Sequence, residues 1–181
     1  YPDDVTVTHL SKKGDKTLDF TLWNSLTKDL IANGEYSMEE SNFKEGSVSV
    51  DTNGILLRGS VKDNGLQFAS YLGVKTDGQV TAQDGYLTVI GASYAILLLS
   101  AKTNFAQNPK TNYRKDIDVE NTVKSIVEAA KAKDYETLKN NHIKDYQSLF
   151  NRVQLNLGGN KSSQTTKEAL HTYNPEKGQK L

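Results

Sequence analysis

Apolar and polar side chains alternate along much of the first hundred residues, a pattern typical of half-buried β-strands. Val5 and Val7 alternate with threonines, and Leu18, Phe20 and Leu22 alternate with polar residues. A Lys-Lys-Gly-Asp segment suited to a turn lies between the two runs. The pattern therefore predicts a hairpin of two strands near the beginning of the chain.

Regular turn signals divide residues 47–101 into short apolar segments. Each Asn-Gly or Asp-Gly pair provides positive φ at little cost, and short strands at this spacing predict an antiparallel β-sandwich. The segment from Tyr94 to Leu99 is nearly all apolar, so we expect a central strand covered on both faces. Residues 24–46 show no clear period and are expected to be loop-rich. The turn pairs are Asn53-Gly54, Asn64-Gly65, Asp77-Gly78 and Asp84-Gly85.

Helical spacing replaces alternation beyond a polar boundary segment at residues 104–115. Glu120 and Lys124 form a favourable pair one turn apart on this first helix. An apolar stripe of this kind predicts an amphipathic helix that packs on another layer. The stripe contains Val119, Val123, Ile126, Val127 and Ala130.

A second helix is expected after Asp134, which is a suitable N-cap. Its apolar side chains need a cover, either the sheet of the same chain or a second copy of the chain in a homodimer. A further strand is predicted where Val153, Leu155 and Leu157 alternate with polar residues. Asn174, followed by proline, favours the start of a third helix. One face of the second helix presents Leu138, His142, Asp145, Tyr146 and Leu149, with Phe150 beside them.

The expected fold class is mainly β with α. Residues 1–106 are expected to form the antiparallel β-sandwich portion. Residues 107–181 are expected to form a linker region with two helices, a short strand, a polar loop at 160–166 and the start of a truncated helix. Because so short a helix is marginal in water, we expect a further domain downstream.

Charge and composition argue against several classes of partner. Lys and Arg together number 22, as do Asp and Glu, so the formal net charge is zero. Binding to nucleic acid or to an anionic membrane would favour a clustered basic surface, whereas a neutral sugar meets no electrostatic objection. The absence of cysteine excludes disulfides and thiolate metal sites. No apolar run approaches the roughly 18 residues of a membrane-spanning helix, and we expect no cofactor.

Two parts of the sequence resemble glycoside hydrolase family 95. The more specific part is a helical pattern, His-x-x-Asp-Tyr-x-x-Leu-Phe-x-Arg-Val, followed by an alternating apolar segment and a glycine. The strand-rich part is less specific, since many sandwiches carry such runs. The matching residues are Tyr1-Pro2-Asp3, the run from Asp63 to Phe68, the run from Ala95 to Ala101 with Thr103 and Phe105, and His142 to Val153 with Leu155, Leu157 and Gly158.

The resemblance implies the architecture and activity of a parent enzyme. Family members are chiefly inverting α-L-fucosidases that act on fucose linked α-1,2 to galactose, and some act on α-L-galactosides. They combine an N-terminal β-sandwich, a helical linker, an (α/α)6 barrel with the active site, and a C-terminal β domain. The chain is then the later part of the sandwich with the linker, inactive without the barrel. An extracellular or cell-surface bacterial location is also implied, although no signal peptide is visible.

No catalytic, cofactor-binding or metal-binding residue is expected in this chain. Inverting hydrolysis needs two carboxyl groups roughly 6.5–9.5 Å apart. The adjacent pairs Asp3-Asp4 and Glu39-Glu40 would point to opposite faces of a strand. His9, His142 and His171 do not have the spacing of a zinc site.

The second helix carries the expected contact with the missing barrel. His142 lies within one turn of Asp145 and Tyr146, so its side chain can contact either of them on the helix surface. A hydrogen-bonding role for His142 at that interface is favoured over a catalytic one. The residues assigned to the interface are His142, Asp145, Tyr146 and Phe150.

Two other functions stay open on the sequence. A non-enzymatic carbohydrate-binding or adhesive β-sandwich fits the zero net charge, the turn-rich strands and the nine tyrosines. Packing in the core or on the sheet is favoured for Trp23 over a sugar-stacking role. A related barrel enzyme that acts on another glycoside or by phosphorolysis is the third possibility, because similar folds serve several chemistries.

Overall fold

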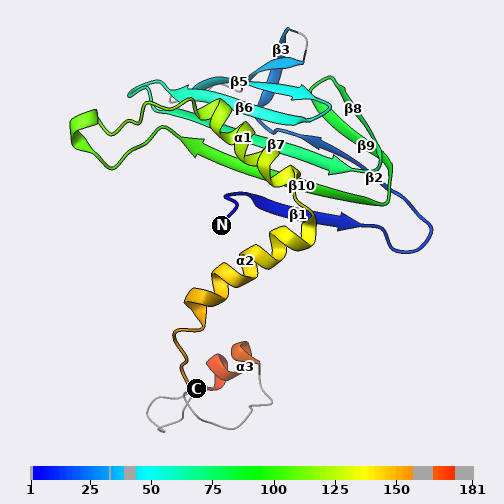
Figure 1. The fold of residues 1–181 in the computed structure, drawn as a ribbon, viewed down its shortest axis with the longest axis vertical. Helices are drawn as coiled ribbons and strands as arrows, with labels where there is room; N and C mark the ends of the chain where they lie inside the picture. The colour runs from blue at the N-terminus through cyan, green and yellow to red at the C-terminus, as the bar shows by residue number, and fades with distance from the viewer. Residues whose placement is uncertain (1, 33, 39–43, 157–164, 174–181) are drawn as a thin grey trace. The chain divides into compact units, whose positions relative to one another are not determined.

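The computed structural model describes all residues except 1, 33, 39–43, 157–164 and 174–181. The chain divides into two compact units, residues 1–147 and residues 148–181. The first unit contains the strands, a 3-10 turn η1 (Pro109–Thr111), helix α1 (Val119–Lys131) and most of helix α2 (Tyr135–Phe150) (Figure 1). The strands are β1 (Thr6–Ser11), β2 (Leu18–Trp23), β3 (Thr27–Ala32), β4 (Glu35–Met38), β5 (Lys44–Asp51), β6 (Gly54–Val61), β7 (Gln67–Thr76), β8 (Gln79–Gln83), β9 (Tyr86–Ala92) and β10 (Tyr94–Thr103).

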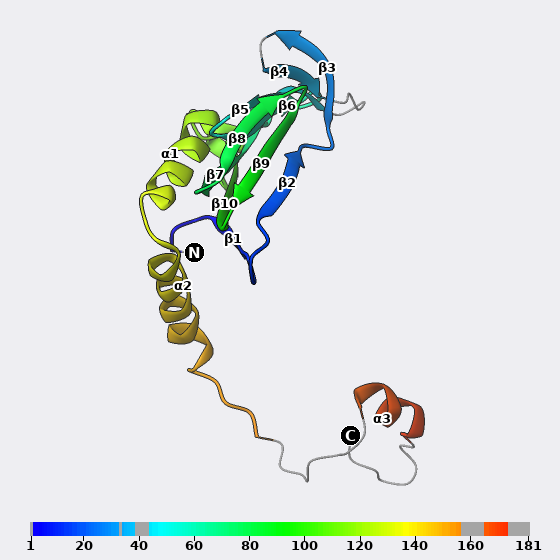
Figure 2. The ribbon, with the colours of Figure 1, turned by 90° about the vertical axis from the view of Figure 1, so that its right-hand side faces the viewer.

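Two antiparallel sheets of unequal size form the sandwich. The larger, seven-stranded sheet has the order β1-β10-β7-β6-β5-β4-β3, and the smaller, three-stranded sheet has the order β2-β9-β8. Helix α1 covers one face of the larger sheet, and the smaller sheet lies against the opposite face (Figure 2). The expected fold class, an antiparallel β-sandwich followed by helices, is therefore confirmed.

Two hydrophobic cores lie on either side of the larger sheet. In β10, Ile96 and Leu98 face the core under α1, whereas Leu97 packs toward the smaller sheet. This strand is paired on both edges, with β1 and β7. The expectation of an inner strand covered on both faces is correct, because a run without alternation needs apolar neighbours on each side.

Helix α1 lies across β7 and β10, as Figure 1 shows. Its first turn is capped by the Asp118 side chain, which accepts from the backbone N–H of Asn121 at 2.9 Å. Gly73 in β7 allows close approach, because a Cβ there would lie 2.5 Å from Cγ1 of Val127. The predicted stripe is thus the buried face, with Ile126 at its margin. Its fully covered members are Val119, Val123, Val127 and Ala130.

The hairpin predicted near the beginning of the chain is wrong. β1 pairs with β10 in the larger sheet, and β2 pairs with β9 in the smaller one. Val7 accordingly packs in the core under α1, and Phe20 packs between the sheets. Alternation reports that one face of a strand is buried, but it carries no information about the strand with which it pairs.

The expectation of a loop-rich segment at residues 24–46 is also wrong. It contains β3, β4 and the start of β5, which extend the larger sheet at one edge. β3 is mostly exposed and its pairing with β4 is irregular. An edge strand in water does not need an apolar face, so it leaves a weak periodic signal.

Past α2, Val153 to Asn156 have no regular secondary structure, so the predicted strand is absent there. A strand needs a neighbour for its backbone hydrogen bonds, and no described strand pairs with these residues. Leu157 and the predicted helix start at Asn174 lie outside the described residues. The predicted polar loop extends one residue too far, because helix α3 (Thr166–Thr172) begins after a capping box of Thr165 and Glu168.

No helix in the described part of the chain is long and apolar enough to cross a lipid bilayer.

Candidate functional site

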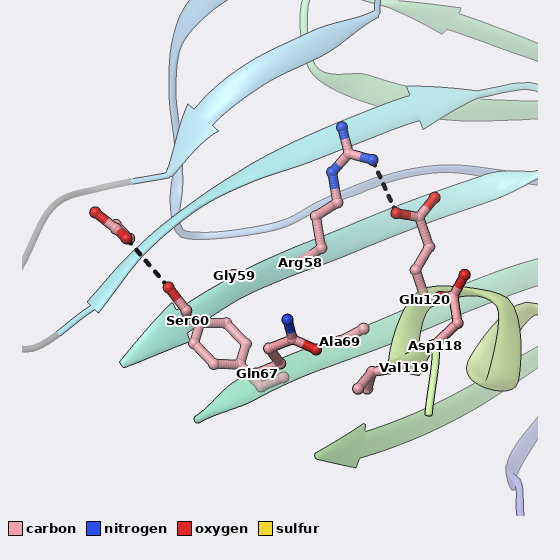
Figure 3. Close-up of a pocket in the computed structure, with 10 residues that line it drawn as sticks. Arg58, Gly59, Ser60, Gln67, Ala69, Asp118, Val119 and Glu120 are labelled. Carbon is pink, nitrogen blue, oxygen red and sulfur yellow. Dashed lines mark hydrogen bonds and ion pairs between the residues drawn. The ribbon is translucent and has the colours of Figure 1, made fainter. Parts of the chain in front are cut away.

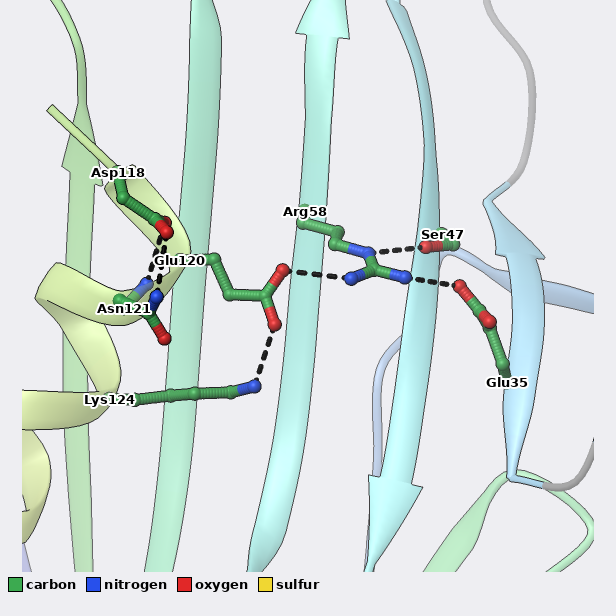
Figure 4. A network of polar contacts seen from close by, with 7 residues as sticks. All are labelled: Glu35, Ser47, Arg58, Asp118, Glu120, Asn121 and Lys124. Atoms are coloured by element: carbon green, nitrogen blue, oxygen red, sulfur yellow. Dashed lines mark hydrogen bonds and ion pairs between the residues drawn. The ribbon is translucent and has the colours of Figure 1, made fainter. Parts of the chain in front are cut away.

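Arg58 of β6 anchors the first turn of α1 to the larger sheet through an ion pair with Glu120 (Figure 4). The guanidinium donates from Nη1 to Glu120 of α1 at 2.8 Å and from Nη2 to Glu35 of β4 at 2.6 Å. Its Nε donates to Oγ of Ser47 at 3.1 Å, and Nζ of Lys124 lies 2.6 Å from the second oxygen of Glu120. One side chain thus links three strands to the helix.

The electrostatics of this network favour a structural role. The hydrogen bond from Lys124, followed by that from Arg58, lowers the pKa of the Glu120 carboxyl. The hydrogen bond from Arg58 also lowers the pKa of Glu35, with Ser47 adding to it. A general acid for glycoside hydrolysis needs a raised pKa, so neither carboxyl is suited to that role.

A groove of about 490 Å³ lies between this network and the adjoining strand ends (Figure 3). Arg58, Ser60 and Gln67 line it from the sheet, and Asp118 and Glu120 line it from the start of α1. The guanidinium is occupied by two carboxylates, and Ser60 donates to a third, from Glu45, at 3.2 Å. The polar side chains that line the groove thus link α1 to the sheet. Among the residues that line it, no cationic side chain is left free to bind an anionic ligand.

The end of α1 is fastened by Lys75 of β7. Its Nζ donates to the backbone oxygens of Lys131 at 2.8 Å and Lys133 at 2.9 Å, where the helix carries partial negative charge. The side chain of Lys133 forms an ion pair with Asp3, and this hydrogen bond lowers the pKa of Asp3. Asn141 of α2 also donates to Asp3, at 3.3 Å. Both ends of α1 and the beginning of α2 are therefore tied to the sandwich.

Helix α2 begins at the predicted cap, since Oδ1 of Asp134 accepts from the backbone N–H of Thr137 at 2.6 Å. Leu138 is buried in the core under α1. Beside it, a groove of about 440 Å³ lies between β1 and α2, with His142 and Val5 in its lining. The sandwich thus holds the first part of α2.

The residues assigned to an interface lie farther along α2. His142 is exposed and its ring stacks on Tyr146, with centroids 6.3 Å apart. Asp145 is half-buried, Tyr146 is 52% exposed and Phe150 is 63% exposed. His142, Asp145 and Tyr146 are therefore close together, and their role at an interface stays a prediction.

The other candidate residues lie apart from one another. Asp4 pairs with Lys102, His9 stacks on Tyr135 with centroids 4.1 Å apart, and His171 lies in the last turn of α3. Glu39-Glu40 lies outside the described residues. Among the residues the structure describes, no group of three potential metal ligands converges.

Each described carboxyl whose pKa clearly departs from its ordinary value is shifted downward, because each accepts a hydrogen bond from a neighbouring donor. These carboxyls belong to Asp3, Glu35, Asp77, Glu120, Asp134 and Glu168.

Sequence reasoning missed Arg58 and Lys75. Arg58 is the only arginine before residue 114 and interrupts an apolar strand, which is a visible signal. Its partner Glu120, however, is 62 residues away. Only the folded sheet brings the two together.

Residues 1–108 match the model of glycosyl hydrolase family 65, N-terminal domain, and residues 134–181 match that of the glycosyl hydrolase family 95 catalytic domain. Alpha-L-fucosidase 2 of Arabidopsis thaliana is 36% identical over 111 residues, which cover 60% of this chain. The chain spans 13% of the length of that relative.

The second match contains the pattern from His142 to Val153, so the resemblance to family 95 is confirmed. The matches leave residues 109–133, which include α1, between the two domains. The chain belongs to the glycosyl hydrolase family 65 N-terminal domain family, and its last part is similar to the glycosyl hydrolase family 95 catalytic domain.

Proposed function

We propose that this chain is the non-catalytic support of an α-L-fucosidase-type hydrolase that removes α-1,2-linked fucose from glycans by inversion. The observation that supports this proposal is that hydrogen bonds from the sheet hold α1 at both of its ends. Arg58 ties the first turn to the sheet, and Lys75 ties the last carbonyls. The similarity to alpha-L-fucosidase 2 supports the activity of the parent protein. By family resemblance, the parent enzyme acts outside a bacterial cell or on its surface.

In this proposal the sandwich sets the position and direction of α2. Only residues 132–134 separate the two helices, and Asn141 and Leu138 hold the first turns of α2 against the sandwich. The segment matched by the family 95 model begins at residue 134. Rigid attachment at that point orients the catalytic domain, whose remainder packs on the face that contains His142, Asp145, Tyr146 and Phe150.

The first experiment compares the 181-residue chain with the parent protein on a fucosyl-α-1,2-galactoside. We expect turnover only by the parent, with inversion seen by NMR as the β-anomer of the released fucose. Turnover by the chain alone would refute the non-catalytic role, and retention would refute the inverting mechanism.

A second experiment tests the support itself in the parent protein. Arg58→Ala combined with Lys75→Ala should lower both kcat and Tm, because both fastenings of α1 are lost. Lys102→Ala is the matched control, since this lysine of β10 forms an ion pair with Asp4, just before β1. Unchanged activity and Tm in the double variant would show that the catalytic domain does not depend on this attachment.

The alternative, a carbohydrate-binding module without an enzyme, is favoured by one observation. Trp23, placed by the smaller sheet, is 61% exposed. A parent protein that binds fucosylated glycans but hydrolyses none would establish this alternative.

A further inference from the structure

Two aromatic side chains stand side by side on the outer face of the smaller sheet. Trp23 of β2 and Tyr86 of β9 are directly paired across the strands. Their rings are 6.3 Å apart and tilted by 52°, and the side chains are 61% and 49% exposed. Covering a large aromatic side chain stabilises a fold by about 1.5–3 kcal/mol. Such a pair left in water is therefore an apolar surface open to a ligand.

The strand pattern determines this orientation. Leu22 and Leu87, the neighbours of the two aromatic residues, point inward to the core between the sheets. Period-2 geometry then directs Trp23 and Tyr86 outward. In the next row, the hydroxyls of Thr21 and Thr88 lie 3.2 Å apart, so the outer face continues with polar groups beside the rings.

A cavity of about 320 Å³ adjoins the aromatic pair. This volume lies at the lower end of the range of small-molecule sites, roughly 300–1,000 Å³. Its wall presents an amide, a hydroxyl, an ammonium group and a carboxylate, so it offers both hydrogen-bond donors and hydrogen-bond acceptors to a ligand. These groups belong to Asn24, Ser25, Lys28 and Asp84.

Tight turns hold both sides of this cavity. Asn24 accepts from the backbone N–H of Leu26 at 2.9 Å and closes one turn. Asp84 and Gly85 have φ of 53° and 81° and close the other. A site with walls held in this way loses little conformational entropy when a ligand binds.

Thr27 also lines the cavity. Among the described residues, its Oγ1 is the only buried side-chain N or O atom without a hydrogen-bond partner. Buried polar groups normally find partners, and one left alone costs about 1–3 kcal/mol. This oxygen is buried, so a ligand in the open cavity does not reach it, and the polar contacts come from Asn24, Ser25, Lys28 and Asp84.

We propose that this cavity binds one unit of a neutral sugar, with an apolar sugar face on Trp23 and Tyr86. Sugar hydroxyls would exchange hydrogen bonds with the polar wall. Lys28 and Asp84 contribute opposite charges, so the wall has no net charge to select an anion. An aliphatic ligand would leave those polar groups without partners. The inference rests on this geometry and holds whether or not the parent protein is a fucosidase.

The test uses the 181-residue chain and two neutral probes, 2′-fucosyllactose and lactose. Trp23 is the sole tryptophan, so intrinsic fluorescence reports directly on the cavity. We expect a saturable change with at least one probe at a Kd on the order of 1 mM, typical of weak small-ligand binding. Tyr86→Ala should weaken binding about three- to tenfold, whereas Tyr86→Phe should retain it.

Controls separate this cavity from other aromatic surfaces. Trp23→Ala, followed by calorimetry, should abolish binding. Phe105→Ala should leave it unchanged, because Phe105 is 50% exposed but stacks on Tyr113 elsewhere. Absence of a saturable change at about 10 mM probe, or binding that survives Trp23→Ala, would overturn the inference. Since both aromatic side chains are largely exposed, circular dichroism should show the variants folded.

Discussion

A methyl group added at Gly73 is a sharp test of how α1 lies on the sheet. An ideal Cβ at this position would be 2.5 Å from Cγ1 of Val127, whereas carbon atoms pack at about 3.5–4.0 Å. Val127 is fully buried, and a valine in a helix has essentially one rotamer. The helix must therefore shift, and such overpacking costs about 1–3 kcal/mol.

A double-mutant cycle isolates this contact. Val127→Ala alone should lower the free energy of unfolding by about 2 kcal/mol, through two lost methyl groups and the space they leave. Gly73→Ala combined with Val127→Ala should also cost about 2 kcal/mol, because the second change makes room for the first. The coupling energy is then about 2 kcal/mol, well above the error expected for independent sites. Urea denaturation followed by circular dichroism measures all four proteins.

Val119 provides the matched control on the same helix. It is 5% exposed and lies about 12 Å along the axis from Val127, at 1.5 Å per residue. Gly73→Ala and Val119→Ala should therefore be additive. Additive costs for Gly73→Ala and Val127→Ala would refute the close contact between α1 and β7.

Three further predictions concern charge, burial and association. Arg58→Ala should cost about 1 kcal/mol at neutral pH, because the guanidinium is 42% exposed. Since the folded-state pKa of Glu120 is lowered, its contribution exists above the ordinary value of 4.5 and is lost as the pH falls. Urea denaturation should thus show the stabilities of the variant and the wild type converging as the pH falls below 4.5. Burial raises the pKa of Tyr71 to about 12, so stability should fall as the pH rises from 10.0 through about 12. Tyr71→Phe should flatten that loss in alkaline denaturation, and an unchanged slope would exclude Tyr71 as its source. Leu149 and Phe150 of α2 are 58% and 63% exposed, so the 181-residue chain should self-associate with rising concentration and Leu149→Lys with Phe150→Lys should prevent it. A sedimentation experiment that finds only monomer would contradict this packing argument.

Most elements could be predicted from local pattern. The stripe from Val119 to Ala130 became the buried face of α1, and Asp134 became the cap of α2. The pattern from His142 to Val153 lies within the segment matched by the family 95 model, and all but its last three residues belong to α2. These features involve neighbours within a few residues, whose geometry the backbone determines directly.

The pairing of elements required the folded chain. β1 and β2 have the same alternation, yet they lie in different sheets, because alternation is equally satisfied by any partner that covers the apolar face. Arg58 meets Glu120 across 62 residues, a contact that no local spacing encodes.

The cavity beside Trp23 and Tyr86 also combines a feature that the sequence predicts with one that only the fold determines. The outward direction of Trp23 follows from period 2 along its own strand, but its neighbour Tyr86 comes from a distant strand. Local periodicity determines which side of an element is apolar. Long-range packing decides what lies against that side and which side chains remain in water, because it depends on shape and burial summed over the whole fold.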